Sequence, residues 1–130
     1  MDQTSQNKNK RILVVEDEEF IRDLYVRILK NEGYTVEQAK DGAEGFSALQ
    51  KGGYDLVLLD IMLPVINGLD ILKKLSKIPP QQPNKVVLII TNLDQDIAVA
   101  EGLSYGIRGY LIKNTISPEE LRHEVRKHLQ

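Results

Sequence analysis

The 130-residue sequence contains no cysteine and no tryptophan, and it has only two histidines. Without cysteine, disulfide bonds, thiolate catalysis and cysteine-ligated zinc or iron–sulfur sites are excluded. His123 and His128 both lie near the C-terminal end. A histidine-rich metal site and a Ser-His-Asp triad are therefore disfavoured as well.

The sequence also lacks an excess of positive charge and a long apolar run. Its 17 Lys and Arg against 19 Asp and Glu give a net charge of −2. This balance has no electrostatic footprint of general nucleic-acid binding, so we expect no nucleic-acid partner. No apolar run has the length of a membrane span, and the polar start lacks the apolar stretch of a secretory signal. We therefore expect no membrane association and a cytoplasmic location.

The chain divides into a short lead-in and one domain. Residues 1–10 are polar after Met1 and show no periodicity, which predicts a disordered lead-in before a domain over residues 11–130. Within that domain a short apolar run followed by a segment with helical spacing occurs five times. The apolar runs are Ile12–Val15, Tyr34–Val36, Leu56–Leu59, Val86–Ile90 and Tyr110–Ile112. Such nearly continuous runs are typical of strands buried on both faces, and the weaker second run suits an edge strand.

Capping residues mark where the helical segments begin. Asp41 with Glu44, Asn67, and Ser117 before Pro118 are typical helix starts. A further helix is expected to begin near Asp94. The proline-rich stretch Ser76–Lys85 predicts a surface loop, since its prolines cannot continue a helix or enter a central strand.

This alternation predicts an α/β fold. We expect a flavodoxin-like (βα)5 three-layer sandwich with a parallel five-stranded sheet of order 2-1-3-4-5. In such sheets ligands bind at the carboxyl ends of the strands. The functional residues should therefore stand where the predicted strands end.

Charged and hydroxyl side chains follow four of the five predicted strands. Glu16 and Asp17 come after the first, Asp60 after the third, Thr91 after the fourth and Lys113 after the fifth. Carboxylates brought together must take up protons or bind a cation. Oxygen ligands without cysteine or nearby histidine favour a hard divalent cation such as Mg²⁺. A carboxylate can also act as a nucleophile toward phosphorus, with the cation, the ammonium and the hydroxyl neutralising the phosphoryl oxygens.

Four segments in this order resemble the receiver domain of two-component response regulators. The segment ILVVEDEE at residues 12–19 is similar to the family's first strand and acid pair, and DLVLLDIMLPVING at 55–68 to its phosphoacceptor segment. VLIITN at 87–92 and GYLIK at 109–113 resemble the fourth and fifth strands with their threonine, aromatic and lysine. The resemblance covers residues 11–129, and four motifs in order are far more specific than one.

The resemblance implies a role for each site residue. Asp60 is the expected phosphoacceptor, with Lys113 and Thr91 assisting. Asp17, Asp60, Glu16 and the backbone carbonyl of Met62 are expected to bind Mg²⁺, for which Mn²⁺ can substitute. Thr91 and Tyr110 are the expected switch pair.

The resemblance also implies the partners. A histidine kinase or phosphotransfer protein would donate the phosphoryl group, and a downstream protein would read a phosphorylation-biased surface. Because no further domain follows in this sequence, we expect a stand-alone regulator, monomeric or weakly dimeric. It would catalyse its own phosphorylation and dephosphorylation without turning over an external substrate, so it is not expected to be an enzyme.

Two positions depart from the family pattern and keep an alternative open. Asn92 stands where a small residue is usual, and Asn114 stands where proline is usual. The alternative is an interaction module on the same fold that works without phosphorylation. A flavin or nucleotide site is a weaker third hypothesis, because Glu16 to Glu19 occupy the place of a phosphate-binding loop and would repel phosphate.

Overall fold

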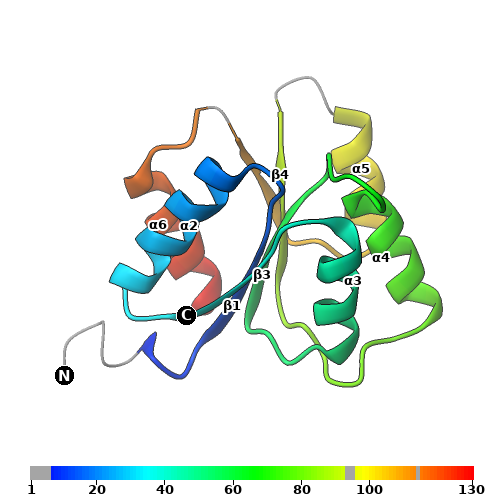
Figure 1. Ribbon diagram of the computed structural model, residues 1–130, viewed down its shortest axis with the longest axis horizontal. Helices are drawn as coiled ribbons and strands as arrows, with labels where there is room; N and C mark the ends of the chain where they lie inside the picture. The colour runs from blue at the N-terminus through cyan, green and yellow to red at the C-terminus, as the bar shows by residue number, and fades with distance from the viewer. Residues whose placement is uncertain (1–6, 93–95, 114) are drawn as a thin grey trace.

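The computed structural model describes residues 7–92, 96–113 and 115–130, which form a three-layer α/β sandwich (Figure 1). Its middle layer is a sheet of five parallel strands in the order β2-β1-β3-β4-β5. The strands are β1 (Arg11–Val15), β2 (Thr35–Ala39), β3 (Leu56–Asp60), β4 (Val87–Thr91) and β5 (Gly109–Ile112). The predicted fold class and strand order are confirmed.

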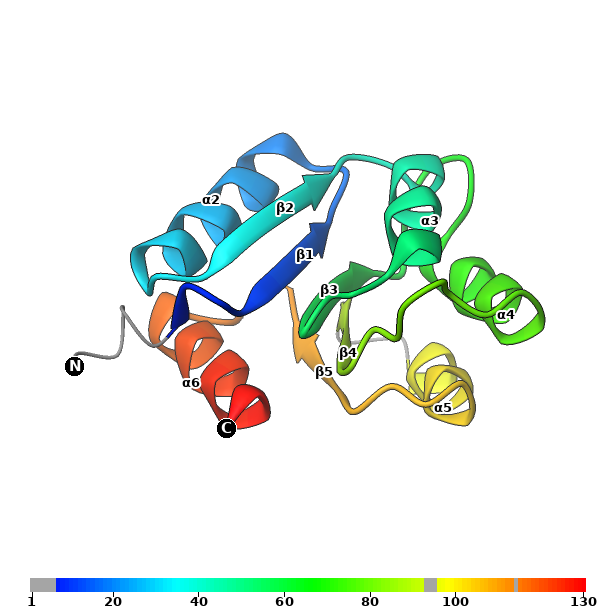
Figure 2. The ribbon, with the colours of Figure 1, turned by 90° about the horizontal axis from the view of Figure 1, so that it is seen from below.

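The helices cover the two faces of the sheet unequally. The pair α2 (Glu19–Asn31) and α6 (Pro118–Leu129) lies on one face, and α3 (Gly42–Lys51), α4 (Gly68–Lys77) and α5 (Asp96–Ser104) lie on the other (Figures 1 and 2). Because the strands are parallel, their carboxyl ends all lie at one edge of the sandwich.

The alternation of side chains along each strand divides the core into two halves. In β1, Ile12 and Val14 pack into the cluster that includes α2 and α6, whereas Leu13 and Val15 pack into the opposite cluster. All four are almost fully buried. Burial on both faces explains why the apolar runs are continuous rather than alternating. The weaker run belongs to β2, a mostly exposed strand at the edge of the sheet.

The predicted capping residues begin three helices. The side chain of Asp41 accepts a hydrogen bond from the Glu44 amide at 2.8 Å, and that of Asn67 accepts one from the Asp70 amide at 2.9 Å. Ser117 caps α6 in the same way, with Pro118 in its first turn. Asp94, near which a helix start was predicted, lies outside the described residues; α5 begins at Asp96.

Residues before β1 contact the rest of the domain. The side-chain amide of Asn7 donates to the carbonyl of Glu32 over 2.7 Å, and the Thr35 hydroxyl donates to the carbonyl of Lys8 over 2.9 Å. These contacts attach the chain before β1 to the end of α2 and the start of β2. Residues 1–6 of the predicted lead-in lie outside the described part of the chain, and the domain boundary stays a prediction.

The first two residues of the predicted loop, Ser76 and Lys77, complete α4, and the proline-rich remainder is an exposed excursion that returns to the fold through backbone contacts. The amide of Gln82 donates to the carbonyl of Lys51 over 3.1 Å, and Gly52 forms a bridge with Gln82. Gly52 has φ of 73°, and a Cβ there would stand 1.7 Å from the Gln82 carbonyl oxygen. Only glycine fits this close approach.

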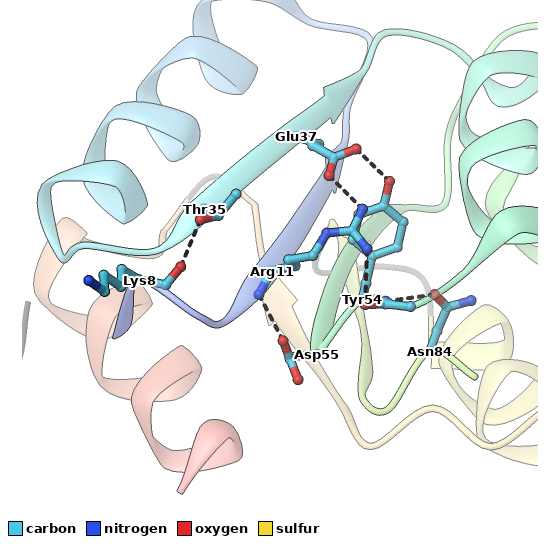
Figure 3. A network of polar contacts seen from close by, with 8 residues as sticks. Lys8, Arg11, Thr35, Glu37, Tyr54, Asp55 and Asn84 are labelled. Carbon is cyan, nitrogen blue, oxygen red and sulfur yellow. Dashed lines mark hydrogen bonds and ion pairs between the residues drawn. The ribbon is translucent and has the colours of Figure 1, made fainter. Parts of the chain in front are cut away.

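A polar cluster ties the sheet together at the edge where the strands begin (Figure 3). The Arg11 guanidinium lies 2.6 Å from a carboxylate oxygen of Glu37 and 4.6 Å from the ring centre of Tyr54. The Tyr54 hydroxyl donates to the other Glu37 oxygen over 2.9 Å, and the Arg11 amide donates to Asp55 over 2.8 Å. Burial opposes ionisation of Glu37, but the hydrogen bonds from Arg11 and Tyr54 together lower its pKa. The cluster therefore holds the starts of three strands.

Candidate functional site

The strands carry the predicted site residues to one edge of the sheet. Glu16 and Asp17 follow β1, Asp60 ends β3, Thr91 ends β4 and Lys113 follows β5. The parallel register sets Asp60 beside Ile90 and Thr91 beside Ile112, so these ends lie nearly level.

Three carboxylates converge at this edge. One oxygen from each of Glu16, Asp17 and Asp60 lies within 4.8 Å of the others. Glu16 is 0% exposed and Asp60 is 2% exposed, whereas the Asp17 side chain reaches solvent. The group is thus a buried acid pair with one acid at its mouth.

Lys113 supplies the positive charge for this cluster. Its ammonium nitrogen lies 2.6 Å from Oε1 of Glu16 and 3.1 Å from Oδ2 of Asp60. The Lys113 side chain is only 7% exposed. It also lies 2.7 Å from Oε1 of Glu18. One ammonium therefore contacts three acidic side chains from two strand ends.

Burial and neighbouring charges shift the titration of two of these groups. Burial, together with the adjacent Asp60 carboxyl, raises the pKa of Glu16 to about 9, although Lys113 opposes the shift. Burial alone would lower the pKa of Lys113, but the carboxylates of Glu16, Glu18 and Asp60 raise it above its usual value. Lys113 therefore stays an ammonium at neutral pH, while Glu16 favours its neutral form.

The donor set suits a hard cation. Neither Glu16 oxygen accepts a well-aligned hydrogen bond from the described residues, although both oxygens are buried. Lys113 is a single positive charge among several acids, and a metal ion coordinated by oxygen would stabilise them further. The acids present therefore fit a Mg²⁺ ion.

The loop after β3 holds Asp60 and turns back toward α4. The Met62 amide donates to Oδ1 of Asp60 over 3.1 Å, while Oδ2 faces Lys113. The Gly68 amide donates to the carbonyl of Ile61 over 2.9 Å, and a Cβ at Gly68 would lie 2.5 Å from the carbonyl oxygen of Asp60. Glycine at position 68 thus permits the close turn that fixes the Asp60 carboxylate.

The two predicted switch residues differ in exposure. Thr91 is 2% exposed, and its hydroxyl donates to the Asn92 carbonyl over 3.2 Å. Tyr110 on β5 is 53% exposed, so its side chain lies at the surface rather than in the acid cluster. Of the two departures from the family pattern, Asn92 is half-buried beside the site, and Asn114 lies outside the described residues.

Two residues near the site were not singled out from the sequence. Glu18 contacts Lys113, and the signal for it was its place in the run of acids after β1. Tyr25 on α2 is 4% exposed, and burial together with the charge of Glu16 raises its pKa to about 12. In the sequence Tyr25 is indistinguishable from the apolar stripe of its helix, so spacing alone gives no sign of the nearby acid.

Residues 12–126 match the family model of the response regulator receiver domain. The chain belongs to this family. It is 43% identical over 101 residues to the uncharacterized transcriptional regulatory protein YcbL and 40% identical over 119 residues to the uncharacterized transcriptional regulatory protein YkoG, both from Bacillus subtilis (strain 168). These alignments cover 78% and 92% of this chain but 43% and 50% of the relatives. The chain therefore spans about half the length of these relatives.

The solved structures include a close match in fold. A CheY-like response regulator receiver domain protein from Methanospirillum hungatei JF-1 is 30% identical, with a TM-score of 0.80 over 92% of this chain and 93% of that chain. This receiver domain thus belongs to the two-component response regulators, which act in phosphorelay signalling and are generally not turnover enzymes. Receiver domains bind Mg²⁺ through acidic residues, and this one brings Glu16, Asp17 and Asp60 together.

The relatives correct one expectation about partners. The charge balance led us to expect no nucleic-acid partner, but YcbL and YkoG are named as transcriptional regulatory proteins. The charge balance does not indicate the partners of those proteins, because it describes only a receiver segment that covers about half of each. The stand-alone organisation stays a prediction for the same reason.

Within the described residues, every helix is too short or too polar to cross a membrane. The cytoplasmic location stays a prediction.

Proposed function

We propose that this receiver domain accepts a phosphoryl group on Asp60 from a histidine kinase or phosphotransfer protein, in a reaction that requires Mg²⁺. The observation that carries the proposal is the contact of the buried Lys113 ammonium with Asp60 and Glu16 at 3.1 and 2.6 Å. A lysine that served only to neutralise surface acids would not need to be buried between two strand ends.

The Asp60 carboxylate is the nucleophile. One of its oxygens forms a bond to phosphorus as the phosphorus–nitrogen bond to the donor imidazole breaks, and the electron pair of that bond goes to the imidazole nitrogen. The Met62 amide and Lys113 hold the two Asp60 oxygens in place. Lys113, whose pKa is raised, stays protonated and stabilises the negative charge of the phosphoryl oxygens.

Asp17, Asp60, Glu16 and the backbone carbonyl of Met62 are the residues that would hold the metal ion. When bound, Mg²⁺ supplies positive charge for the phosphoryl oxygens, and Mn²⁺ can serve in its place. Among these acids, Asp17 reaches solvent and Glu16 is buried.

Phosphorylation would be reported through Thr91 and Tyr110. The Thr91 hydroxyl turns toward the phosphoryl group, which gives the half-exposed Tyr110 ring room to move inward. The change biases the surface formed by α5, β5 and α6 between two states, and a downstream protein reads it. Output within a regulator of transcription is suggested by the names of YcbL and YkoG.

The test is the intact mass after incubation with Mg²⁺ and acetyl phosphate, with and without chelator. The proposal predicts one phosphoryl adduct that requires Mg²⁺ and is absent from Asp60→Asn, while circular dichroism shows that the variant is folded. An adduct of equal yield in folded Asp60→Asn would contradict the assignment. A folded wild type that takes no phosphoryl group from acetyl phosphate or from a histidine kinase would favour the phosphorylation-independent module.

A further inference from the structure

The loop between β3 and α4 contains a strained residue. Val65 has φ of 72°, and among the described residues it is the only non-glycine residue with positive φ. The Ile66 amide donates to the Pro64 carbonyl over 2.9 Å, so Val65 is the centre of a three-residue γ-turn. This form of the γ-turn is rare and strained, and β-branched side chains fit it poorly.

The strain at Val65 is not offset by burial within the domain. Its side chain is 82% exposed. Glycine or asparagine would adopt the same backbone conformation more easily. Strained residues are concentrated where a segment makes functional contacts. Because Val65 is exposed in this conformation, its side chain is accessible to a partner outside the domain.

Val65 stands at the end of a hollow that runs along α4. The hollow has a volume of about 440 Å³ and is lined by Val65, Ile66, Asp70, Lys73, Lys74 and Lys77. Val65 and Ile66 make one end apolar, and the side carries three lysines and one aspartate. We refer to these six residues as the α4 hollow.

The lysines of the α4 hollow lack acidic partners among the described side chains. None of Lys73, Lys74 and Lys77 takes part in an ion pair with another described side chain. Lys74 lies over the ring of Phe46, 5.5 Å from its centre. Lys74 and Lys77 are in the last turn of α4, where cations interact favourably with the helix dipole. That effect accounts for lysines at the end of the helix but not for the exposed valine at the other end of the hollow.

We propose that the α4 hollow docks an acidic segment of a partner protein. An apolar side chain of the partner covers Val65 and Ile66, and its carboxylates face Lys73 and Lys77. The assignment rests on charge complementarity to unpaired lysines and on the apolar end that a charged ligand alone would leave uncovered. It is independent of the phosphoryl chemistry at Asp60.

A nucleic acid suits the α4 hollow less well. No arginine lines it, and the apolar end offers nothing to a sugar–phosphate backbone. The favoured occupant is therefore a peptide segment with both carboxylates and an aliphatic or aromatic side chain.

The test is a titration of the isotope-labelled domain, followed by amide NMR shifts, with a glutamate-rich peptide that carries leucines. A peptide with glutamine at every glutamate position is the matched control. The proposal predicts shifts at Val65, Lys73 and Lys77 with the acidic peptide only. The double variant Lys73→Gln/Lys77→Gln should weaken binding about tenfold, because it removes two of the positive charges that face the carboxylates of the peptide. Lys8→Gln/Lys30→Gln, at exposed lysines outside the hollow, should leave binding unchanged.

A second variant tests the apolar end without risk to the fold. Val65→Asn tolerates the positive φ and removes the apolar side chain, so it should weaken the peptide several-fold while the domain stays folded. Shifts outside the α4 hollow, equal binding of the glutamine peptide, or unchanged affinity in Val65→Asn would overturn the proposal. Tighter binding of duplex DNA than of the acidic peptide to the same residues would assign the hollow to nucleic acid instead.

Discussion

The ammonium nitrogen of Lys113 lies 2.6 Å from Oε1 of Glu16, a side chain that is entirely buried. Glu16 has no well-aligned hydrogen-bond donor among the described residues, and its pKa is raised to about 9. The two side chains therefore do not form an isolated ion pair, because the same lysine contacts several acids. Because acidic groups outnumber positive charges at this site, it favours the binding of a second cation.

The first prediction concerns the stability of Glu16→Gln. Because burial raises the folded-state pKa of Glu16 to about 9 from an ordinary value of 4.5, the native protein favours the neutral carboxyl. The contribution of the neutral Glu16 carboxyl to the free energy of unfolding is complete below about pH 4.5 and is lost as the pH rises toward 9. In chelator, urea denaturation should therefore show Glu16→Gln gaining stability relative to wild type between pH 5 and pH 9.

Magnesium should make wild type more stable than Glu16→Gln, which is the reverse of the trend expected in chelator. Wild type gains stability from the ion by mass action, whereas Glu16→Gln binds it more weakly and gains less. Glu16→Asp retains a carboxylate and is the matched control for metal binding. A stability difference between wild type and Glu16→Gln that does not change with pH would contradict the raised pKa.

The second prediction concerns the switch. Tyr110 is 53% exposed without phosphorylation, and we expect its ring to become less exposed after it. The NMR signal of the Tyr110 ring, assigned with Tyr110→Phe, reports this change through its accessibility to a soluble paramagnetic probe. Thr91→Ala should still be phosphorylated but should leave Tyr110 exposed, because the hydroxyl that links the two is missing. If phosphorylation protects Tyr110 equally well in Thr91→Ala, the movement of Tyr110 does not depend on Thr91, and the prediction is wrong.

The third prediction concerns strain in the loop after β3. Val65→Gly should stabilise the domain by about 1 kcal/mol, because glycine adopts the positive φ of 72° without the clash of a β-branched side chain. The gain is limited by the larger backbone freedom of glycine in the unfolded chain. Val65→Ala, which keeps a Cβ, is the control and should gain less. Chemical denaturation measures both, and a loss of stability in Val65→Gly would show that the turn is unstrained.

The fourth prediction separates the fold from the site. Tyr54→Phe removes the hydrogen bond to Glu37 and should destabilise the domain by about 1 kcal/mol. Since Tyr54 lies at the edge where the strands begin (Figure 3), phosphorylation by acetyl phosphate should keep its wild-type rate. A slower reaction in a folded Tyr54→Phe protein would mean that the two edges are coupled.

Much of the fold could be predicted because local and global signals agree. The continuous apolar runs, the caps at Asp41, Asn67 and Ser117, and the repeated alternation of strand and helix all indicate one parallel sheet. The convergence of Glu16 and Asp60 followed from topology alone, since parallel strands end at the same edge.

The rest depended on contacts that spacing does not encode. The bond of Lys113 to Glu18 and the placement of Tyr25 near Glu16 depend on side-chain directions in three dimensions. The left-handed conformation of Val65 has no sequence signal, because valine is a residue that disfavours it. The expectation about nucleic acid failed for another reason: charge on one segment does not report the partners of longer relatives.

The most direct test of the account is to locate the phosphoryl group. After reaction with Mg²⁺ and acetyl phosphate, borohydride reduces an aspartyl phosphate to homoserine, and peptide mass spectrometry identifies the altered residue. The account predicts one homoserine, at position 60, that is lost when chelator is present. Reduction at Asp17 or at another carboxylate, with Asp60 unaltered, would contradict the assignment of Asp60 as phosphoacceptor.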